Sequence, residues 1–143
     1  MTEVTVASSD AEIIECFPLF KVLRPHLSET GSSVFLERVH SQQQGGYEVA
    51  YIRESGEIVS AAGYRELEFL AWGRVLYVDD LVTDPGRLGR GLAGTLMDWL
   101  ISQARLRQCT ELHLDTGYQR HAAHRLYLSK GLQLNCHHLA LKL

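Results

Sequence analysis

The chain has 143 residues and a mass of 16.1 kDa, which is the size of one ordinary domain, so we expect residues 1–143 to form a single domain. Hydrophobic residues make up 45% of the sequence and charged residues 22%, which excludes a disordered chain. The formal net charge is −3, which argues against a protein that binds the phosphate backbone of nucleic acids.

The cysteines and the N-terminus bear on where the protein works. Cys16, Cys109 and Cys136 are few and widely spaced, so we predict reduced thiols rather than a disulfide framework. The first residues are acidic and lack the apolar stretch of a signal peptide. No run approaches the roughly 18–20 apolar residues that cross a bilayer. We expect a cytoplasmic protein with no membrane partner.

The first part of the chain predicts a strand followed by two helices. Alternation over residues 3–7 indicates a short strand. Asp10 is expected to cap the first helix, and Pro18 is expected to kink or split it. Thr30 or Ser32 is expected to cap the second helix.

The pattern then changes to strands, and a long helix divides them. The predicted strands are residues 47–53, 57–69, 74–83, 110–116 and 132–143, and the predicted helices are residues 91–107 and 121–130. Short turns join the early strands, so these should be antiparallel. The crossover through the long helix should make strands 74–83 and 110–116 parallel. The expected order is β-α-α-β-β-β-α-β-α-β.

A glycine-rich loop joins strand 74–83 to the long helix and predicts an anion site. It runs from Asp84 to Gly94 and includes Gly89, Gly91 and two arginines. Glycines allow close approach of the backbone to a ligand, and the free N–H groups of a helix N-terminus favour an anion. A solvated surface turn is the alternative interpretation. The loop lacks the Gly-Lys-Ser/Thr sequence of a P-loop.

A dinucleotide site is a second interpretation of the same loop. The spacing Gly89-x-Gly91-x-x-Gly94 matches that pattern, and Asp115 follows about 20 residues later, as the pattern requires. However, the glycines do not follow their strand directly, and the chain after Asp115 is too short for the rest of such a sheet.

Two linked motifs carry a more specific resemblance. The loop reads Leu88-Gly89-Arg90-Gly91-Leu92-Ala93, and downstream stands Arg120-x-x-Ala123-x-x-Leu126-Tyr127-x-x-x-Gly131-Leu132. Together they resemble the GNAT superfamily of acetyl-coenzyme A-dependent N-acetyltransferases. Leu88 stands where the family commonly has Gln or Arg, and Arg120 where it commonly has Asn. The resemblance implies an α/β (α+β) fold with a mixed, mostly antiparallel central sheet and helices on both faces.

The same resemblance implies acetyl-coenzyme A as the co-substrate and places its contacts. In the family the strand before the loop splays from its parallel neighbour, and the pantetheine arm inserts between them. The implied cofactor-binding residues are Leu81, Val82, Thr83, Leu88, Gly89, Arg90, Gly91, Leu92, Ala93 and Gly94. The first three would offer backbone groups, one of which polarises the thioester carbonyl. The glycine loop would hold the pyrophosphate through N–H groups, with the Leu92 side chain in the core.

Two catalytic residues follow from the resemblance. Tyr127 matches the family's general acid, which protonates the leaving thiolate. Asp79 stands where polyamine acetyltransferases of the superfamily have an acceptor-side glutamate, so it is the candidate general base, with Glu68 and His113 as weaker alternatives. Adjacent carboxylates on a strand point to opposite faces, so we expect Asp79 and Asp80 to diverge.

The resemblance implies an N-acetyltransferase that moves the acetyl group to a primary amine of a small molecule or protein by direct attack in a ternary complex. The alternative is a non-catalytic acyl-coenzyme A sensor on the same fold. The loop around Arg24-Pro25-His26 is expected to shape the acceptor site. The histidines lack the spacing of a zinc site, so no metal is expected. The apolar end of strand 132–143 is expected to allow pairing across a homodimer.

Overall fold

A five-stranded sheet with strand order β1-β2-β3-β4-β5 forms the centre of the computed structural model, which describes residues 2–143. The strands are β1 (Val4–Val6), β2 (Glu48–Glu54), β3 (Glu57–Phe69), β4 (Gly73–Thr83) and β5 (Glu111–Leu114). Neighbours from β1 to β4 are antiparallel, and β5 is parallel to β4. The parallel pair predicted from the crossover is therefore present.

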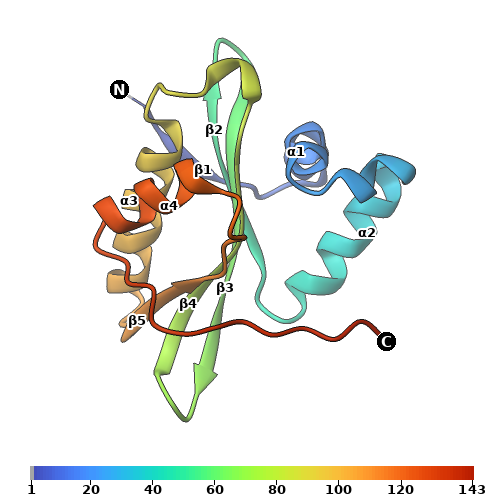
Figure 1. Cartoon of the computed structure of the whole chain (residues 1–143). Coiled ribbons are helices and arrows are strands. Elements are labelled where there is room, and N and C mark those ends of the chain that lie inside the picture. The colour runs from blue at the N-terminus through green and yellow to red at the C-terminus, as the bar shows by residue number, and fades with distance from the viewer. Residues whose placement is uncertain (1) are drawn as a thin grey trace.

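Helices cover both faces of this sheet (Figure 1). They are α1 (Asp10–Leu23), α2 (Ser32–Gln43), α3 (Leu92–Leu106) and α4 (His121–Ser129), with short 3₁₀ helices at Pro25–Glu29 and Pro85–Arg87. One apolar core joins α1 and α2 to one face of the sheet, and a second joins α3 and Tyr127 of α4 to the other face. The expected mixed sheet with helices on both faces is confirmed.

The starts of α1 and α2 differ from the prediction in detail. Ser9, not Asp10, is the N-cap of α1, and its hydroxyl accepts the Glu12 N–H at 3.2 Å. Pro18 lies inside α1 without splitting it, because buried residues on both sides of the proline anchor the helix to the core. Helix α2 has Gly31 as its N-cap, so neither Thr30 nor Ser32 caps it.

The predicted last strand is wrong. Leu132 closes the end of α4 with an N–H bond to the Tyr127 carbonyl at 3.0 Å, and residues 133–143 form no strand. A strand needs a neighbour to share its backbone hydrogen bonds, and this segment has none in the described chain. Figure 1 shows it leaving α4 and crossing the view toward the side of α2, rather than running alongside β5.

A β-bulge in β4 determines how the sheet opens. Gly63 of β3 pairs with Asp80 and Tyr64 with Val78, so Asp79 is the extra residue. The pairing of β4 with β5 ends at Val78, directly before the bulge. A bulge bends its strand and increases the local twist, so it accounts for the separation of β4 from β5 at this point.

Candidate active site

A slot opens where β4 and β5 separate. Beyond Val78, β4 continues to Thr83 and pairs only with β3, which leaves the other edge of residues 81–83 unpaired. A cavity of about 490 Å³ lies along this edge. Leu81, Val82 and Thr83 line it from β4, Leu88 from the loop, and Tyr127 from α4. The slot therefore brings together the predicted strand residues and the predicted acid.

The glycine loop continues from the slot to the N-terminus of α3. Gly89 and Gly91 have φ values of +77° and +78°, and a Cβ on either would meet no atom within 4 Å. Only glycine adopts this conformation without strain, and the space above it is open. Gly91 is the N-cap of α3, whose intrahelical hydrogen bonds begin with Thr95 N–H to the Gly91 carbonyl at 3.0 Å. The N–H groups of residues 92–94 precede that bond.

The side chains of the loop have separate roles. Leu92, the first residue of α3, is buried in the core, as predicted. Leu88 is 67% exposed at the rim of the slot. Arg87 bonds Glu57 Oε2 at 2.7 Å and also Asp84, and Arg90 bonds Glu54 at 3.2 Å. Both arginines are thus tied to carboxylates beside the loop, so the open backbone N–H groups are its most available anion donors.

Tyr127 closes the inner wall of the slot. Its side chain is buried, and burial raises the pKa of its phenol above the ordinary value, while the Arg120 guanidinium opposes that rise. The phenol therefore remains protonated well above neutral pH and is a proton donor there. Arg120, which stands at the family's Asn position, also lines the slot.

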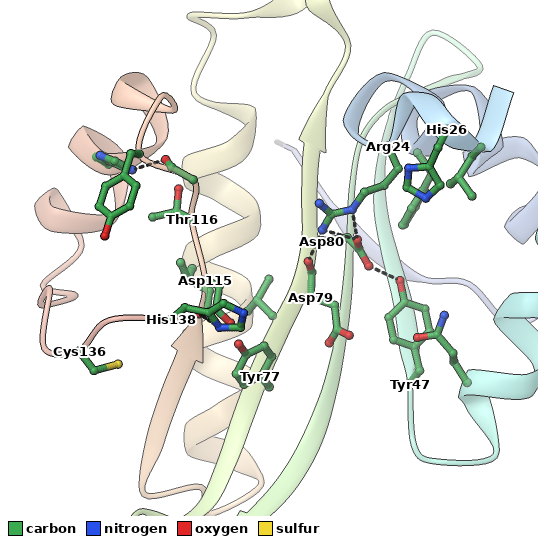
Figure 2. A pocket seen from close by; sticks show the side chains of 18 of the residues that line it. Arg24, His26, Tyr47, Tyr77, Asp79, Asp80, Asp115, Thr116, Cys136 and His138 are labelled. Carbon is green, nitrogen blue, oxygen red and sulfur yellow. Dashed lines mark hydrogen bonds and ion pairs between the residues drawn. The ribbon is translucent and has the colours of Figure 1, made fainter. Parts of the chain in front are cut away.

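A larger cavity of about 1010 Å³ adjoins the slot on the side of α1 and α2. The two spaces share several lining residues, among them Arg24, Val78, Asp79, Leu114 and Asp115. Figure 2 shows Arg24, His26 and Tyr47 on one side of this cavity and Asp115, Thr116 and His138 on the other. Arg24 and His26, from the loop expected to shape an acceptor site, do line the cavity.

Asp79 faces this larger cavity, but it is not a free carboxylate. It accepts hydrogen bonds from Arg65 Nε at 3.1 Å and Arg65 Nη2 at 2.7 Å. Burial raises the pKa of its carboxyl, and the Arg65 guanidinium opposes that rise. Arg65 also donates to Gln42 of α2 at 2.5 Å and lies over the Tyr47 ring. The Asp79 carboxylate is therefore paired with a guanidinium rather than free.

Asp80 lies on the same face as Asp79, so the predicted divergence of the two carboxylates is wrong. The Tyr47 hydroxyl donates to Asp80 Oδ2 at 2.7 Å, and Arg24 Nη2 donates to Asp80 Oδ1 at 3.0 Å. Arg24 Nη2 also reaches the Asp79 carbonyl at 2.9 Å. The bulge inserts one residue and turns Asp79 back toward the α1–α2 side. Burial, with the neighbouring Asp80 carboxylate, raises the pKa of Tyr47.

The two weaker candidates for the base lie elsewhere. Glu68 lies opposite Arg74 of β4 in the strand register, near the end of β3 that is far from the slot. His113 bonds Glu111 at 2.8 Å, and its ring lies tilted against that of Trp72 with centroids 4.4 Å apart, so it belongs to a groove beside β5.

Sequence reasoning missed three contributors to the cavities. Arg65 is unremarkable in the sequence, because its contact with Asp79 depends on the register of β3 and β4. Thr116 carries a buried hydroxyl without a hydrogen-bond partner and lines the larger cavity. His138 pairs with Asp115 at 3.2 Å and lines the same cavity. In the sequence, only the dinucleotide pattern points to Asp115.

Neither a metal centre nor a membrane-spanning helix is found among residues 2–143. No group of three or more His, Cys, Asp or Glu side chains is arranged to hold a metal ion. None of the helices in this range has the length and apolar character needed to cross a membrane.

Comparison with solved structures places the fold. The chain matches a Bacillus halodurans C-125 protein described as a transcriptional regulator with a TM-score of 0.85, 19% identity and full coverage of both chains. It matches a ribosomal-protein-alanine N-acetyltransferase from Brucella melitensis biovar Abortus 2308 with a TM-score of 0.83, 18% identity and 99% coverage of both. AAC(6')-Iy, solved with a bisubstrate analogue containing coenzyme A, matches with a TM-score of 0.82 and 13% identity over 99% of this chain and 97% of that one.

The sequence comparisons give the family. No curated protein sequence matches this one significantly. A sequence model of the acetyltransferase (GNAT) family matches residues 12–132, which include the slot, the glycine loop and Tyr127. Members of this family are acyltransferases that use acetyl-coenzyme A. The chain belongs to the GNAT acetyltransferase family.

Proposed function

We propose that this protein transfers an acetyl group from acetyl-coenzyme A to the primary amine of a small molecule or protein, within a ternary complex. The observation that carries the proposal is the junction of the two cavities at Val78, Asp79 and Leu114. A donor in the slot and an amine in the larger cavity would meet there without a covalent enzyme intermediate.

The residues along the slot fit acetyl-coenzyme A. The unpaired edge of residues 81–83 offers backbone groups to an extended, amide-containing arm, as a neighbouring strand would. The open space above Gly89 and Gly91, together with the N–H groups of residues 92–94, suits a pyrophosphate. The donor supplies an activated thioester carbonyl. Leu88 and Arg90 would lie at the rim of this site rather than carry it.

The chemistry divides between the two predicted catalytic residues. The amine nitrogen forms a bond to the carbonyl carbon as the carbon–sulfur bond breaks. Tyr127 gives its phenolic proton to the departing sulfur, and its raised pKa ensures that this proton is present. The amine must lose a proton, and Asp79 accepts it directly or through a water molecule. The Arg65 contact positions Asp79 and opposes the rise in its pKa that burial causes.

The larger cavity is the proposed acceptor site. Its volume of about 1010 Å³ is at the upper end of the range for small-molecule pockets, and also admits a side chain of a protein. Asp79 and Asp80 are both paired with arginines, so they offer a cationic amine less net negative charge than their sequence suggests.

Thermal unfolding with acetyl-coenzyme A, with NAD as the control, tests donor binding. A ligand at 100 times its Kd stabilises a protein by about 2.7 kcal/mol, which a melting curve resolves. A shift with acetyl-coenzyme A alone supports the proposal, and release of free thiol with a panel of amines then tests turnover. No shift, or a shift with NAD alone, contradicts it. Binding without turnover on any amine would favour the sensor function. The ion pair of Asp79 with Arg65 is the observation that agrees with this alternative.

A further inference from the structure

Three carboxylates line the larger cavity, and each of them has a partner on the protein. Asp79 and Asp80 are paired with arginines at 2.7 Å and 3.0 Å. Asp115 lies 3.2 Å from the His138 ring, which is charged only when it is protonated. The cavity therefore has little uncompensated negative charge, and Asp115 supplies it whenever His138 is neutral.

Arg38 of α2 is a cation of the same cavity that has no such partner. It lines the cavity, its side chain is exposed, and within residues 2–143 no carboxylate forms an ion pair with it. Its planar guanidinium presents parallel N–H groups that match the two oxygens of a carboxylate. A ligand can bind this group without first breaking a contact inside the protein.

Arg38 lies away from the junction of the two cavities. It lines the larger cavity but not the slot, whereas Asp79 and Asp115 line both. It precedes Gln42 on α2 by four residues, which is about 6 Å along a helix. Gln42 in turn contacts Arg65, the partner of Asp79. A ligand with its amine at the junction can reach Arg38 with an anionic group only if several carbon atoms separate the two.

The α1–α2 side of the cavity also offers an apolar surface for such a carbon chain. Four residues that are buried in the core line the cavity from this side, namely Phe20, Leu27, Phe35 and Val39. Figure 2 shows the same side, marked by His26 and Tyr47, opposite Asp115 and His138. The cavity is therefore acidic near the slot, apolar on its α1–α2 side and basic at Arg38.

We propose that the acceptor is a small amino carboxylate, whose amine lies at the junction with the slot and whose carboxylate is bound by Arg38. This inference rests on the proposed function, because it names the substrate class of that same site. A primary amine arrives at neutral pH mostly as an ammonium, and Asp79 and Asp115 stand where it would lie. A zwitterion with separated charges therefore matches both ends of the cavity. A diamine would instead place its second cation against Arg38.

Calorimetric titration of the full chain tests this preference without turnover, in the presence of coenzyme A, which has no acetyl group to transfer. The probes are linear ω-amino acids of four, six and eight carbons, each compared with its own amide, which keeps the amine and the chain but lacks the charge. At least one acid should bind about tenfold more tightly than its amide. Equal affinities for all three pairs, or no binding of any acid, overturns the proposal.

Two variants of Arg38 assign the preference to this side chain. Arg38→Gln should remove the difference between acid and amide, and Arg38→Glu should favour the diamine of the same length instead. Arg105→Glu is the matched control, because Arg105 is an exposed arginine on α3 that lines none of the three cavities. It changes the net charge equally and should keep the preference of the parent. A preference that survives in Arg38→Gln, or that is lost in Arg105→Glu, overturns the assignment.

Acetylation of the same probes separates this inference from the proposed function. The acid should have a kcat/KM about tenfold above that of its amide, with the same dependence on Arg38. Equal kcat/KM values for acid and amide would leave the transferase in place and overturn the inference. Binding of the acid that depends on Arg38, with no acetylation of any amine, would support the amino carboxylate site and contradict the proposed function.

Discussion

Gly63 of β3 leaves the space that the Tyr47 hydroxyl occupies. A Cβ built on Gly63 would lie 1.8 Å from that oxygen and 2.8 Å from Asp80 Oδ2. Tyr47 can donate to Asp80 only because this position has no side chain. One glycine thus permits the partly buried hydrogen bond that anchors Asp80, directly beside the bulge at Asp79.

Gly63→Ala should therefore destabilise the protein by about 1–3 kcal/mol, the usual cost of overpacking a core. Chemical denaturation measures the change. Gly45→Ala is the matched control, because a Cβ there would meet only the Gln42 carbonyl at an ordinary 3.5 Å. Equal stabilities for the two variants would show that Tyr47 moves aside without cost.

Tyr127→Phe should lower kcat by about 10²–10⁴-fold, the usual contribution of a general acid. The Kd for acetyl-coenzyme A should change little, because the ring still lines the slot. Thiol-release kinetics and calorimetric titration measure the two quantities. Tyr51→Phe, a change to a tyrosine that lines neither cavity, should leave both unaltered. Full turnover by Tyr127→Phe would remove Tyr127 from the mechanism.

Gly91→Asp should abolish acetyl-coenzyme A binding, because it sets a side chain and a negative charge in the open space above the loop. Gly91 has a φ of +78°, so the change also strains the backbone. Gly46→Asp controls for that strain, since Gly46 has a φ of +92° in the turn after α2. If both variants bind acetyl-coenzyme A normally by calorimetry, the loop does not hold the pyrophosphate.

Arg65→Gln should move the acidic limb of the kcat/KM profile to higher pH. Burial raises the pKa of Asp79, and Arg65 holds it down, so loss of Arg65 lets that pKa rise further. A base works in its deprotonated form, so activity is then lost at a higher pH than in the parent. Arg53→Gln, which breaks an ion pair with Glu15 outside the site, is the control. An unmoved limb would exclude Asp79 as the base.

Cys136 should react with thiol reagents long before Cys16. Burial raises the pKa of the Cys16 thiol to about 12, so almost no reactive thiolate is present at neutral pH. Cys136 is exposed in the segment that follows α4. Mass spectrometry after brief alkylation of the folded protein gives the order. Early labelling of Cys16 would mean that α1 opens readily from the sheet.

The sequence predicted those helices and strands in which apolar residues recur at a regular spacing. Helix α3 was expected at residues 91–107 and spans Leu92–Leu106, because its apolar stripe repeats over the whole helix. The parallel placement of β5 followed from the crossover rule alone. The glycine loop and Tyr127 were found through a motif, and the fold brings the Tyr127 side chain to the slot beside that loop.

The features that the sequence did not predict have a common physical origin. Each of them depends on contacts with residues that are distant in the chain. Nothing local marks Asp79 as a bulge, because a bulge is a mismatch between two strands. Residues 133–143 have a strand's alternation, but alternation does not supply a neighbour to pair with. The ion pair of Arg65 with Asp79 likewise arises only from strand register.

The early end of the β4–β5 pairing gives the protein an edge strand in the middle of its sheet. Residues 81–83 have unsatisfied backbone groups on one side, a liability that proteins usually confine to their margins. If a ligand acts as the missing strand, amide hydrogen exchange of these residues should slow sharply when it binds, while that of residues 75–78 should not change. Without that ligand, the same edge is where unwanted association of chains would begin. A ligand that binds along this edge of the slot would therefore also protect the protein against aggregation.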